Sequence, residues 1–202
     1  MRLIGLYDSP YVRRTAISLK LLGLDFRHED VSVFRQYDTF AHINPVVKAP
    51  TLVLADGTVL MDSSLILEYA ESRVPPDRRL TPLEPAGQVQ ALRIVGLALA
   101  ACEKAVQIVY ERELRPPEKQ HEPWLERIQT QLLAACRLLE KEFSGDTWLF
   151  GRPMQADVTT AVAWRFLQAR VADVVEKASY PGLVQLGARA EALPQFRSTA
   201  FS

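Results

Sequence analysis

Three short polar motifs in the first part of the chain carry the side chains best placed for chemistry. They are 9–11 (Ser-Pro-Tyr), 48–50 (Lys-Ala-Pro) and the pair Asp62-Ser63. Each lies where a predicted strand meets a predicted helix, or the reverse, inside one alternating pattern. The start of a helix presents unpaired N–H groups and a positive dipole end, so it favours an anion. The motifs therefore predict a site for an anionic or nucleophilic ligand.

Ser9 follows the first predicted strand and precedes the first predicted helix. Its hydroxyl can donate one hydrogen bond to a ligand sulfur. A free thiol has a pKa of about 8.5 and is mostly protonated at neutral pH. Lowering the pKa by one or two units, at about 1.4 kcal/mol each, would make it largely thiolate, which is the nucleophile. The structural alternative is that Ser9 only caps the helix.

Pro50 and the pair Asp62-Ser63 flank the third and fourth predicted strands. Proline is permitted as the first residue of a strand. If the bond before Pro50 is cis, the Ala49 backbone faces the same site and can pair with a peptide ligand; an ordinary trans bond is the alternative. Asp62 and Ser63 suit an amino-acid head group, and they equally suit the cap of a helix.

The three motifs together match the parts of glutathione, which has a γ-glutamyl head, a thiol and a glycine carboxylate. Asp62 and Ser63 offer a pocket for the head, Ala49 a backbone edge for the middle, and Ser9 a donor for the sulfur. Lys48 is able to reach the glycine carboxylate, and its alternative is a solvated lysine at a loop end. Glutathione is therefore the predicted co-substrate.

The elements that position these motifs form an α/β pattern in the first part of the chain. Asp56-Gly57 predicts a hairpin with a type I′ turn, and Gly23 predicts the end of the first helix. The order is βαβ and then ββα, so the first strand pair is parallel and the second antiparallel. This is the thioredoxin-like plan. The predicted strands are 2–7, 26–31, 51–54 and 58–61, and the predicted helices are 11–22, 34–43 and 62–73.

The rest of the chain reads as a linker followed by helices. Residues 75–85 hold four prolines without periodicity. Beyond them apolar residues recur at helical spacing, Pro123 and Pro181 open helices, and 158–171 is apolar almost all round, as in a buried central helix. The predicted domains are 1–74 (thioredoxin-like), 75–85 (linker) and 86–202 (all-helical).

Composition excludes several classes of function. The 202 residues carry a net charge of +0, which argues against a nucleic-acid binder. No apolar run approaches the roughly 18 residues of a membrane span, and the first residues lack a signal peptide's apolar stretch. Both cysteines, Cys102 and Cys136, fall in helical patterns as buried thiols, and the histidines show no metal-ligand spacing. We therefore predict a cytoplasmic protein without a metal, a nucleic-acid partner or a membrane partner.

These residues resemble the cytosolic glutathione transferase family over essentially the whole chain. Residues 44–52 resemble the family motif N-P-x-G-K-V-P-x-L, Asp62-Ser63 its [ED]-S pair, and 9–11 the serine-type site of bacterial and plant tau-like members. The resemblance implies that Ser9 is catalytic, that Pro50 is cis, and that Ala49 makes the main-chain contact to glutathione. It also implies a homodimer.

The sequence departs from the family pattern at several positions. Val47 stands where glycine is usual, and Met154 where Ser or Thr usually caps the buried helix with Asp157. The Ser-Ser-Cys run of maleylacetoacetate isomerases is absent, which disfavours isomerisation. Ser9 replaces the cysteine of the thiol-reducing classes, and a serine cannot form a mixed disulfide.

The predicted function is activation of the glutathione thiol for attack on a small hydrophobic electrophile. Tyr11 and Tyr110 are the candidates for the electrophile pocket, with helix packing the alternative for Tyr11. Arg13 and Arg14 are predicted to be one solvated and one salt-bridged side chain. Two other functions stay open: reduction of peroxides by the same thiolate, and a protein-binding scaffold that has lost thiol chemistry.

Overall fold

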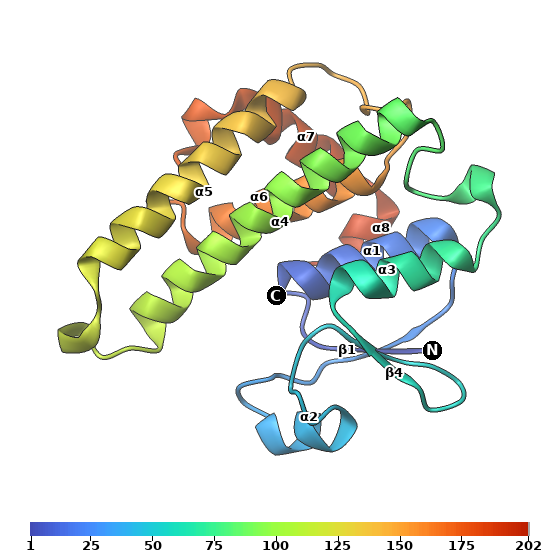
Figure 1. The fold of residues 1–202 in the computed structure, drawn as a ribbon, viewed down its shortest axis with the longest axis horizontal. Helices are drawn as coiled ribbons and strands as arrows, with labels where there is room; N and C mark the ends of the chain where they lie inside the picture. The colour runs from blue at the N-terminus through green and yellow to red at the C-terminus, as the bar shows by residue number, and fades with distance from the viewer. Residues whose placement is uncertain (202) are drawn as a thin grey trace. The chain divides into compact units, whose positions relative to one another are not determined.

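The computed structural model describes residues 1–201, which form two compact units (Figure 1). The first unit is Met1–Leu80 together with the residues from Ala192 onward, and the second is Thr81–Glu191. The sequence assigned residues after 191 to the helical domain, whereas the structure groups them with the sheet. Among residues 1–201, no helix combines the length and the apolar character needed to cross a membrane.

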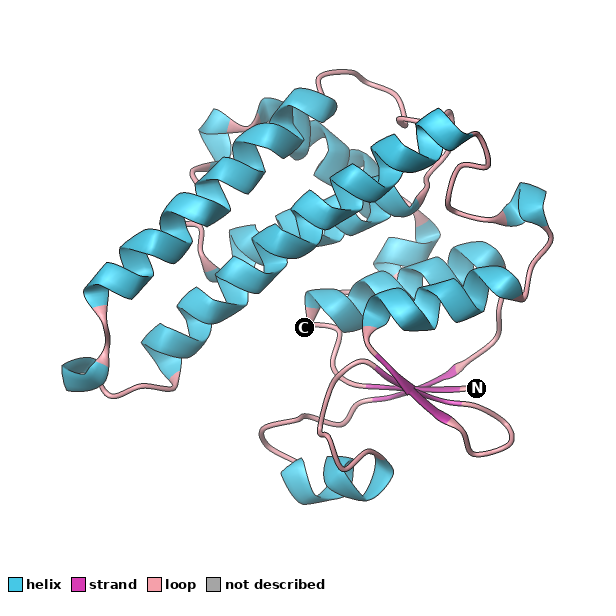
Figure 2. Ribbon diagram, viewed as in Figure 1, coloured by secondary structure: helices cyan, strands magenta, loops and turns pink. Residues whose placement is uncertain are grey.

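A four-stranded mixed sheet organises the first unit, and its strand order is β2-β1-β3-β4. Figure 2 draws its strands in magenta. β1 pairs in parallel with β2, while β1–β3 and β3–β4 are antiparallel, so the predicted strand directions are confirmed. All four strands are shorter than predicted, and β1 ends before Gly5, whose φ of 133° suits glycine. Their bounds are β1 Arg2–Ile4, β2 Arg27–Glu29, β3 Thr51–Val53 and β4 Val59–Met61.

Helices cover both faces of this sheet. α1 (Pro10–Leu22) and α3 (Ser63–Ser72) lie side by side on one face, and α2 (Tyr37–Ile43) lies on the other (Figure 1). Neighbouring strand residues point to opposite faces. Leu3 accordingly packs in the cluster that contains α1 and α3 residues, and Ile4 packs in the cluster around Phe40 of α2. The sheet thus separates two small cores.

The predicted turn chemistry is half right. Gly23 ends α1 in the left-handed region with φ 70°, as expected. The hairpin between β3 and β4 forms, but its turn is not type I′, because that turn needs positive φ at Asp56 and only Gly57 has it. The N–H of Gly57 bonds the carbonyl of Leu54 at 3.1 Å, so Gly57 follows the turn as the left-handed residue.

The second unit is built from helices that pack pairwise, α4 with α5 and α6, and α7 with α5 and α6. α6 is buried along most of its length, which confirms the predicted central helix. Gly187 allows α7 to approach α6, because a Cβ there would lie 2.8 Å from the Trp164 ring. The helices are α4 Pro85–Glu113, α5 Glu122–Glu142, α6 Gln155–Arg170 and α7 Pro181–Glu191, and the short α8 Pro194–Arg197 belongs to the first unit.

At the beginning of α6, Asp157 makes its part of the capping interaction. The Asp157 carboxylate accepts hydrogen bonds from the N–H groups of Met154 at 3.1 Å and Leu149 at 3.2 Å. Burial raises the pKa of Asp157, and these two hydrogen bonds oppose the rise. The Asp157 half of the motif therefore holds the helix start although Met154 replaces the usual hydroxyl residue.

Part of the predicted linker belongs to the first unit. Pro76–Arg78 forms one 3₁₀ turn, and Arg78 Nη2 donates to the Leu22 carbonyl at 2.9 Å. Leu80 is buried in the same apolar cluster as α1 and α3. The chain therefore leaves the first unit only after Leu80.

Val47 stands where the family motif usually has glycine, and it adopts a backbone conformation that favours glycine. Its φ is 52°, in the left-handed region, where a β-branched residue is an outlier. The loop is fixed on both sides: the N–H of Val47 bonds the Asn44 carbonyl at 2.9 Å, and the Thr51 hydroxyl bonds the Lys48 carbonyl at 2.7 Å. The surrounding hydrogen bonds thus impose a conformation that glycine would adopt without strain.

We expect Val47→Gly to be more stable than Val47→Ala by about 1 kcal/mol, because only glycine avoids the left-handed penalty. Chemical denaturation of both variants measures the difference. Val46, exposed in the same loop and without positive φ, is the control. There the alanine variant should be at least as stable as the glycine variant. An alanine variant more stable than glycine at Val47 would contradict the assigned conformation.

Candidate functional site

Ser9 begins α1 and uses its side chain as the helix cap. Its Oγ accepts a hydrogen bond from the N–H of Val12 at a long 3.4 Å, and its carbonyl accepts from the N–H of Arg13 at 3.0 Å. Ser9 is half-buried. A hydroxyl that accepts through a lone pair keeps its own proton for donation. Capping and donation to a ligand sulfur are therefore compatible roles for the same oxygen.

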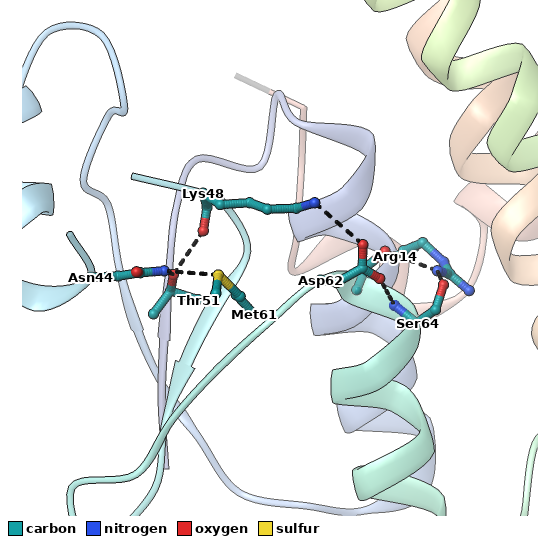
Figure 3. Close-up of polar contacts among 8 residues, drawn as sticks. Arg14, Asn44, Lys48, Thr51, Met61, Asp62 and Ser64 are labelled. Carbon is teal, nitrogen blue, oxygen red and sulfur yellow. Dashed lines mark hydrogen bonds and ion pairs between the residues drawn. The ribbon is translucent and has the colours of Figure 1, made fainter. Parts of the chain in front are cut away.

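The Ala49-Pro50 peptide bond is cis, as the family resemblance implied. Two residues that the sequence analysis missed hold the loop before it (Figure 3). The buried amide of Asn44 donates to the Thr51 hydroxyl at 2.8 Å, and the Thr51 hydroxyl donates to the Lys48 carbonyl at 2.7 Å. Asn44 is the first residue of the motif at 44–52, and this position was the only feature of the sequence that pointed to a role for Asn44.

Asp62 and Ser63 stand at the beginning of α3. Asp62 is the cap residue, with φ 71°, and its Oδ1 accepts from the N–H of Ser64 at 2.9 Å. A positive φ is uncommon outside glycine, although aspartate tolerates it better than most residues. Ser63 is buried, with 3% of its surface exposed. The helix start thus sets an exposed carboxylate beside a buried hydroxyl.

Lys48 lies close to Asp62. Lys48 Nζ is 3.5 Å from Asp62 Oδ2, and both side chains remain about half exposed, at 51% and 43% (Figure 3). An ion pair this accessible to water contributes little stability. Separating Lys48 from Asp62 therefore costs little free energy, so each side chain can pair with a charged end of a ligand instead.

The prediction for Arg13 and Arg14 is wrong, because both side chains are buried. Arg13 Nε donates to the Thr199 carbonyl at 2.8 Å, and its guanidinium lies 5.5 Å from the Phe196 ring centroid. Arg14 Nη1 donates to the hydroxyls of Ser63 and Ser64 at 2.9 and 3.3 Å. Two adjacent charged residues on a helix usually face solvent, and nothing in the spacing of Arg13 and Arg14 indicated that they are buried.

Contacts around Gly5 show that the predicted residues come together. A Cβ on Gly5 would lie 2.7 Å from Val12 Cγ2 and 3.1 Å from Ala49 Cβ, so the start of α1 and the loop of Ala49 meet there. Lys48 then contacts Asp62, and Arg14 of α1 contacts Ser63. These contacts join Ser9, Lys48, Ala49, Asp62 and Ser63 into one ring of neighbouring elements, which we call the candidate site.

Three tyrosines, two in the first unit and one in the second, have different surroundings. The Tyr7 ring stacks on His28 with centroids 3.8 Å apart. Burial, with a smaller effect of the Asp30 carboxylate, raises the pKa of Tyr7 to about 12, so its phenol stays neutral near pH 7. Tyr11 is half-buried in α1, and Tyr110 lies in α4 of the second unit with 44% exposure. The electrophile pocket of Tyr11 and Tyr110 remains a prediction.

The described residues offer no grouping suited to a metal ion. Within residues 1–201, no three or more His, Cys, Asp or Glu side chains cluster as metal ligands would. What the candidate site offers is a hydroxyl at a helix start, a backbone edge, a carboxylate and an ammonium. That set suits a zwitterionic peptide with a thiol.

The chain matches known proteins along both units. The model of the glutathione S-transferase N-terminal domain matches residues 3–78, and that of the C-terminal domain matches residues 122–194. An uncharacterized GST-like protein of Escherichia coli, YibF, is 30% identical over 141 residues, or 69% of this chain and 68% of its own length. Maleylacetoacetate isomerase of Pseudomonas aeruginosa is 30% identical over 166 residues, or 78% and 77%.

Solved structures agree with these matches. A glutathione S-transferase from Methylobacterium radiotolerans, solved in complex with glutathione sulfonate, superimposes with a TM-score of 0.90. It is 29% identical, and the alignment covers 98% of this chain and 93% of that one. The site geometry, the two matching domain models and the relatives together show that the chain belongs to the glutathione S-transferase family of enzymes.

Proposed function

We propose that this protein activates the thiol of glutathione and joins it to a small hydrophobic electrophile. The observation that carries the proposal is the ring of contacts that brings Ser9, Ala49 and Asp62-Ser63 together in one unit. The Methylobacterium radiotolerans structure, which holds glutathione sulfonate, supports the choice of ligand. The same contacts argue against a scaffold that has lost thiol chemistry, because the start of α1, Ala49 and the pair Asp62-Ser63 lie in neighbouring elements.

Ser9 is the residue that we assign to the sulfur. Its hydroxyl donates a hydrogen bond to the thiolate, and the thiol proton leaves to solvent. Stabilising the anion lowers its pKa and raises the fraction of nucleophile at neutral pH. The sulfur electron pair then forms a carbon–sulfur bond to the electrophile, while a leaving group departs with its bonding pair or a π bond opens and its carbon takes a proton from solvent. The same thiolate can attack the oxygen of an organic peroxide, so peroxide reduction stays the alternative activity.

The remaining site residues bind the two ends of the peptide. We assign Asp62 to the γ-glutamyl ammonium, Ser63 to its carboxylate and Lys48 to the glycine carboxylate, with the Ala49 backbone beside the cysteinyl part. The exposed Lys48–Asp62 pair supports this assignment, because its partners separate at little cost. Pro50 shapes the loop and makes no direct contact in this proposal.

We place the protein among serine-type members, near the bacterial and tau-like classes. Ser9-Pro10-Tyr11 supports this choice. The identity to a maleylacetoacetate isomerase does not extend to the Ser-Ser-Cys run, which this chain lacks. We also propose a detoxifying role in the cytoplasm, and the two buried cysteines, neither of which forms a disulfide, are consistent with that compartment.

We also propose a homodimer that uses the exposed apolar face of α4. Val89 and Leu92 are 69% and 59% exposed there, which is unusual for large apolar side chains on one helix. Light scattering at about micromolar concentration should give twice the mass of one chain. Leu92→Glu should yield monomers, while the control Leu138→Glu, on α5, should not. A monomeric wild-type protein would contradict the proposal.

Ser9→Ala should bind glutathione nearly normally yet lose turnover. Without the hydroxyl donor, the bound thiol pKa should return toward about 8.5 and turnover at pH 7 should fall about tenfold or more. Thiolate absorbance in a pH titration of the complex measures the pKa, and conjugation of a model electrophile measures turnover.

Ser9→Asp separates thiol activation from helix capping. Aspartate is a good cap, so this variant should melt at or above the wild-type temperature. Its carboxylate cannot donate a hydrogen bond and repels the thiolate, so turnover should fall as well. Full turnover in the aspartate variant would reduce Ser9 to a cap.

Asp62→Asn should weaken glutathione binding about tenfold and leave turnover at saturation nearly unchanged. The amide keeps the contact to the N–H of Ser64 but loses the charge that faces the ammonium. Asp56→Asn is the matched control, because Asp56 makes the same contact to the N–H of Thr58 at 2.9 Å in the β3–β4 turn. Calorimetric titration with glutathione gives the affinity of each variant. Equal affinities for Asp62→Asn and Asp56→Asn would show that Asp62 does not bind the ligand.

A further inference from the structure

Arg14 is a buried residue of α1 that the proposed chemistry does not use. Only 3% of its surface is exposed, although arginine is rarely buried without a specific role. Its Nη1 reaches two hydroxyls at the start of α3, Ser63 Oγ at 2.9 Å and Ser64 Oγ at 3.3 Å (Figure 3). Nη1 carries two N–H groups, so each hydroxyl can receive its own hydrogen bond.

The Arg14 contact determines what the Ser63 hydroxyl can do. A guanidinium is always protonated and only donates, so Ser63 Oγ must act as the acceptor in this bond. A serine inside a helix often gives its proton to the carbonyl four residues earlier. Ser63 is the first residue of α3, and no such bond forms. Arg14 is the sole hydrogen-bond partner of this hydroxyl within residues 1–201, which leaves the Ser63 proton for a ligand.

We propose that Arg14 is a positioning residue that fixes the Ser63 hydroxyl as a donor to the α-carboxylate of the γ-glutamyl group. The inference rests on the function proposed above. It adds a residue to that function: Arg14 sharpens the preference of the site for a peptide whose γ-linked residue keeps its α-carboxylate. Without Arg14, the Ser63 hydroxyl is free to rotate and to donate elsewhere, and the carboxylate loses a preorganised partner.

The test compares two ligands that differ only in that carboxylate. Glutathione and γ-aminobutyryl-cysteinyl-glycine share the ammonium, the thiol and the glycine end, and only glutathione has the α-carboxylate. Calorimetric titration of the wild-type protein should show an affinity ratio of about tenfold or more in favour of glutathione, since hydrogen bonds to a charged group are strong. Ser63→Ala should lower this ratio strongly.

Arg14→Lys, Arg14→Gln and Arg14→Met test the positioning role. Each should lower the ligand ratio as Ser63→Ala does, while turnover at saturating glutathione stays close to wild type because Ser9 is intact. In the Ser63→Ala background, Arg14→Lys should cause no further loss of the ratio. Ser64→Ala, which leaves the bond between Arg14 and Ser63, should keep the wild-type ratio. A thermal melt confirms that each variant is folded.

The outcomes separate this inference from the proposed function. A wild-type protein that binds neither ligand contradicts the proposed function itself. A wild-type protein that prefers glutathione, together with folded Arg14 variants that keep the preference, overturns only the role of Arg14. Loss of the fold in all three Arg14 variants also overturns it, because Arg14 would then support the structure rather than the selection of the ligand.

Discussion

The first unit depends on satisfying two buried guanidinium groups that follow each other on α1. Burying a charge is costly unless every donor finds an acceptor. Arg13 finds its acceptors in the carbonyls of Phe196 and Thr199, and Arg14 finds them in Ser63 and Ser64. α1 therefore packs stably only when the start of α3 and the segment around α8 are also in place. The same requirement aligns α1 and α3 at the end where the candidate site lies.

The site combines rigid and exchangeable parts. The loop that carries Ala49 is held through Asn44 and Thr51, which are both buried, so its backbone is fixed before a ligand arrives. The charged side chains of Lys48 and Asp62 are about half exposed, and Lys48 Nζ lies 3.5 Å from Asp62 Oδ2. A ligand thus meets a preformed backbone edge and two side chains that change partners readily. This division suits an enzyme that binds and releases a flexible peptide in every cycle.

The sequence predicted the architecture well because apolar periodicity and turn residues report local structure directly. It predicted the strand directions, the end of α1 at Gly23 and the buried helix α6. It missed Arg13 and Arg14, because a charged residue on a helix has the same appearance whether water or a distant carbonyl satisfies it. The type I′ turn was wrong for a similar reason, because Asp56-Gly57 fits more than one kind of turn and only Gly57 of the pair has a positive φ.

The return of the chain to the first unit has a consequence for its synthesis. Domains generally form as units while the chain emerges from the ribosome, the N-terminal one first. Here the first unit includes the residues from Ala192 onward, so it cannot be completed when its first 80 residues emerge. The second unit, Thr81–Glu191, is continuous, so all of its residues are synthesised before those that complete the first unit. The order of folding on the ribosome is therefore expected to be the reverse of the order in sequence, with the candidate site finished last.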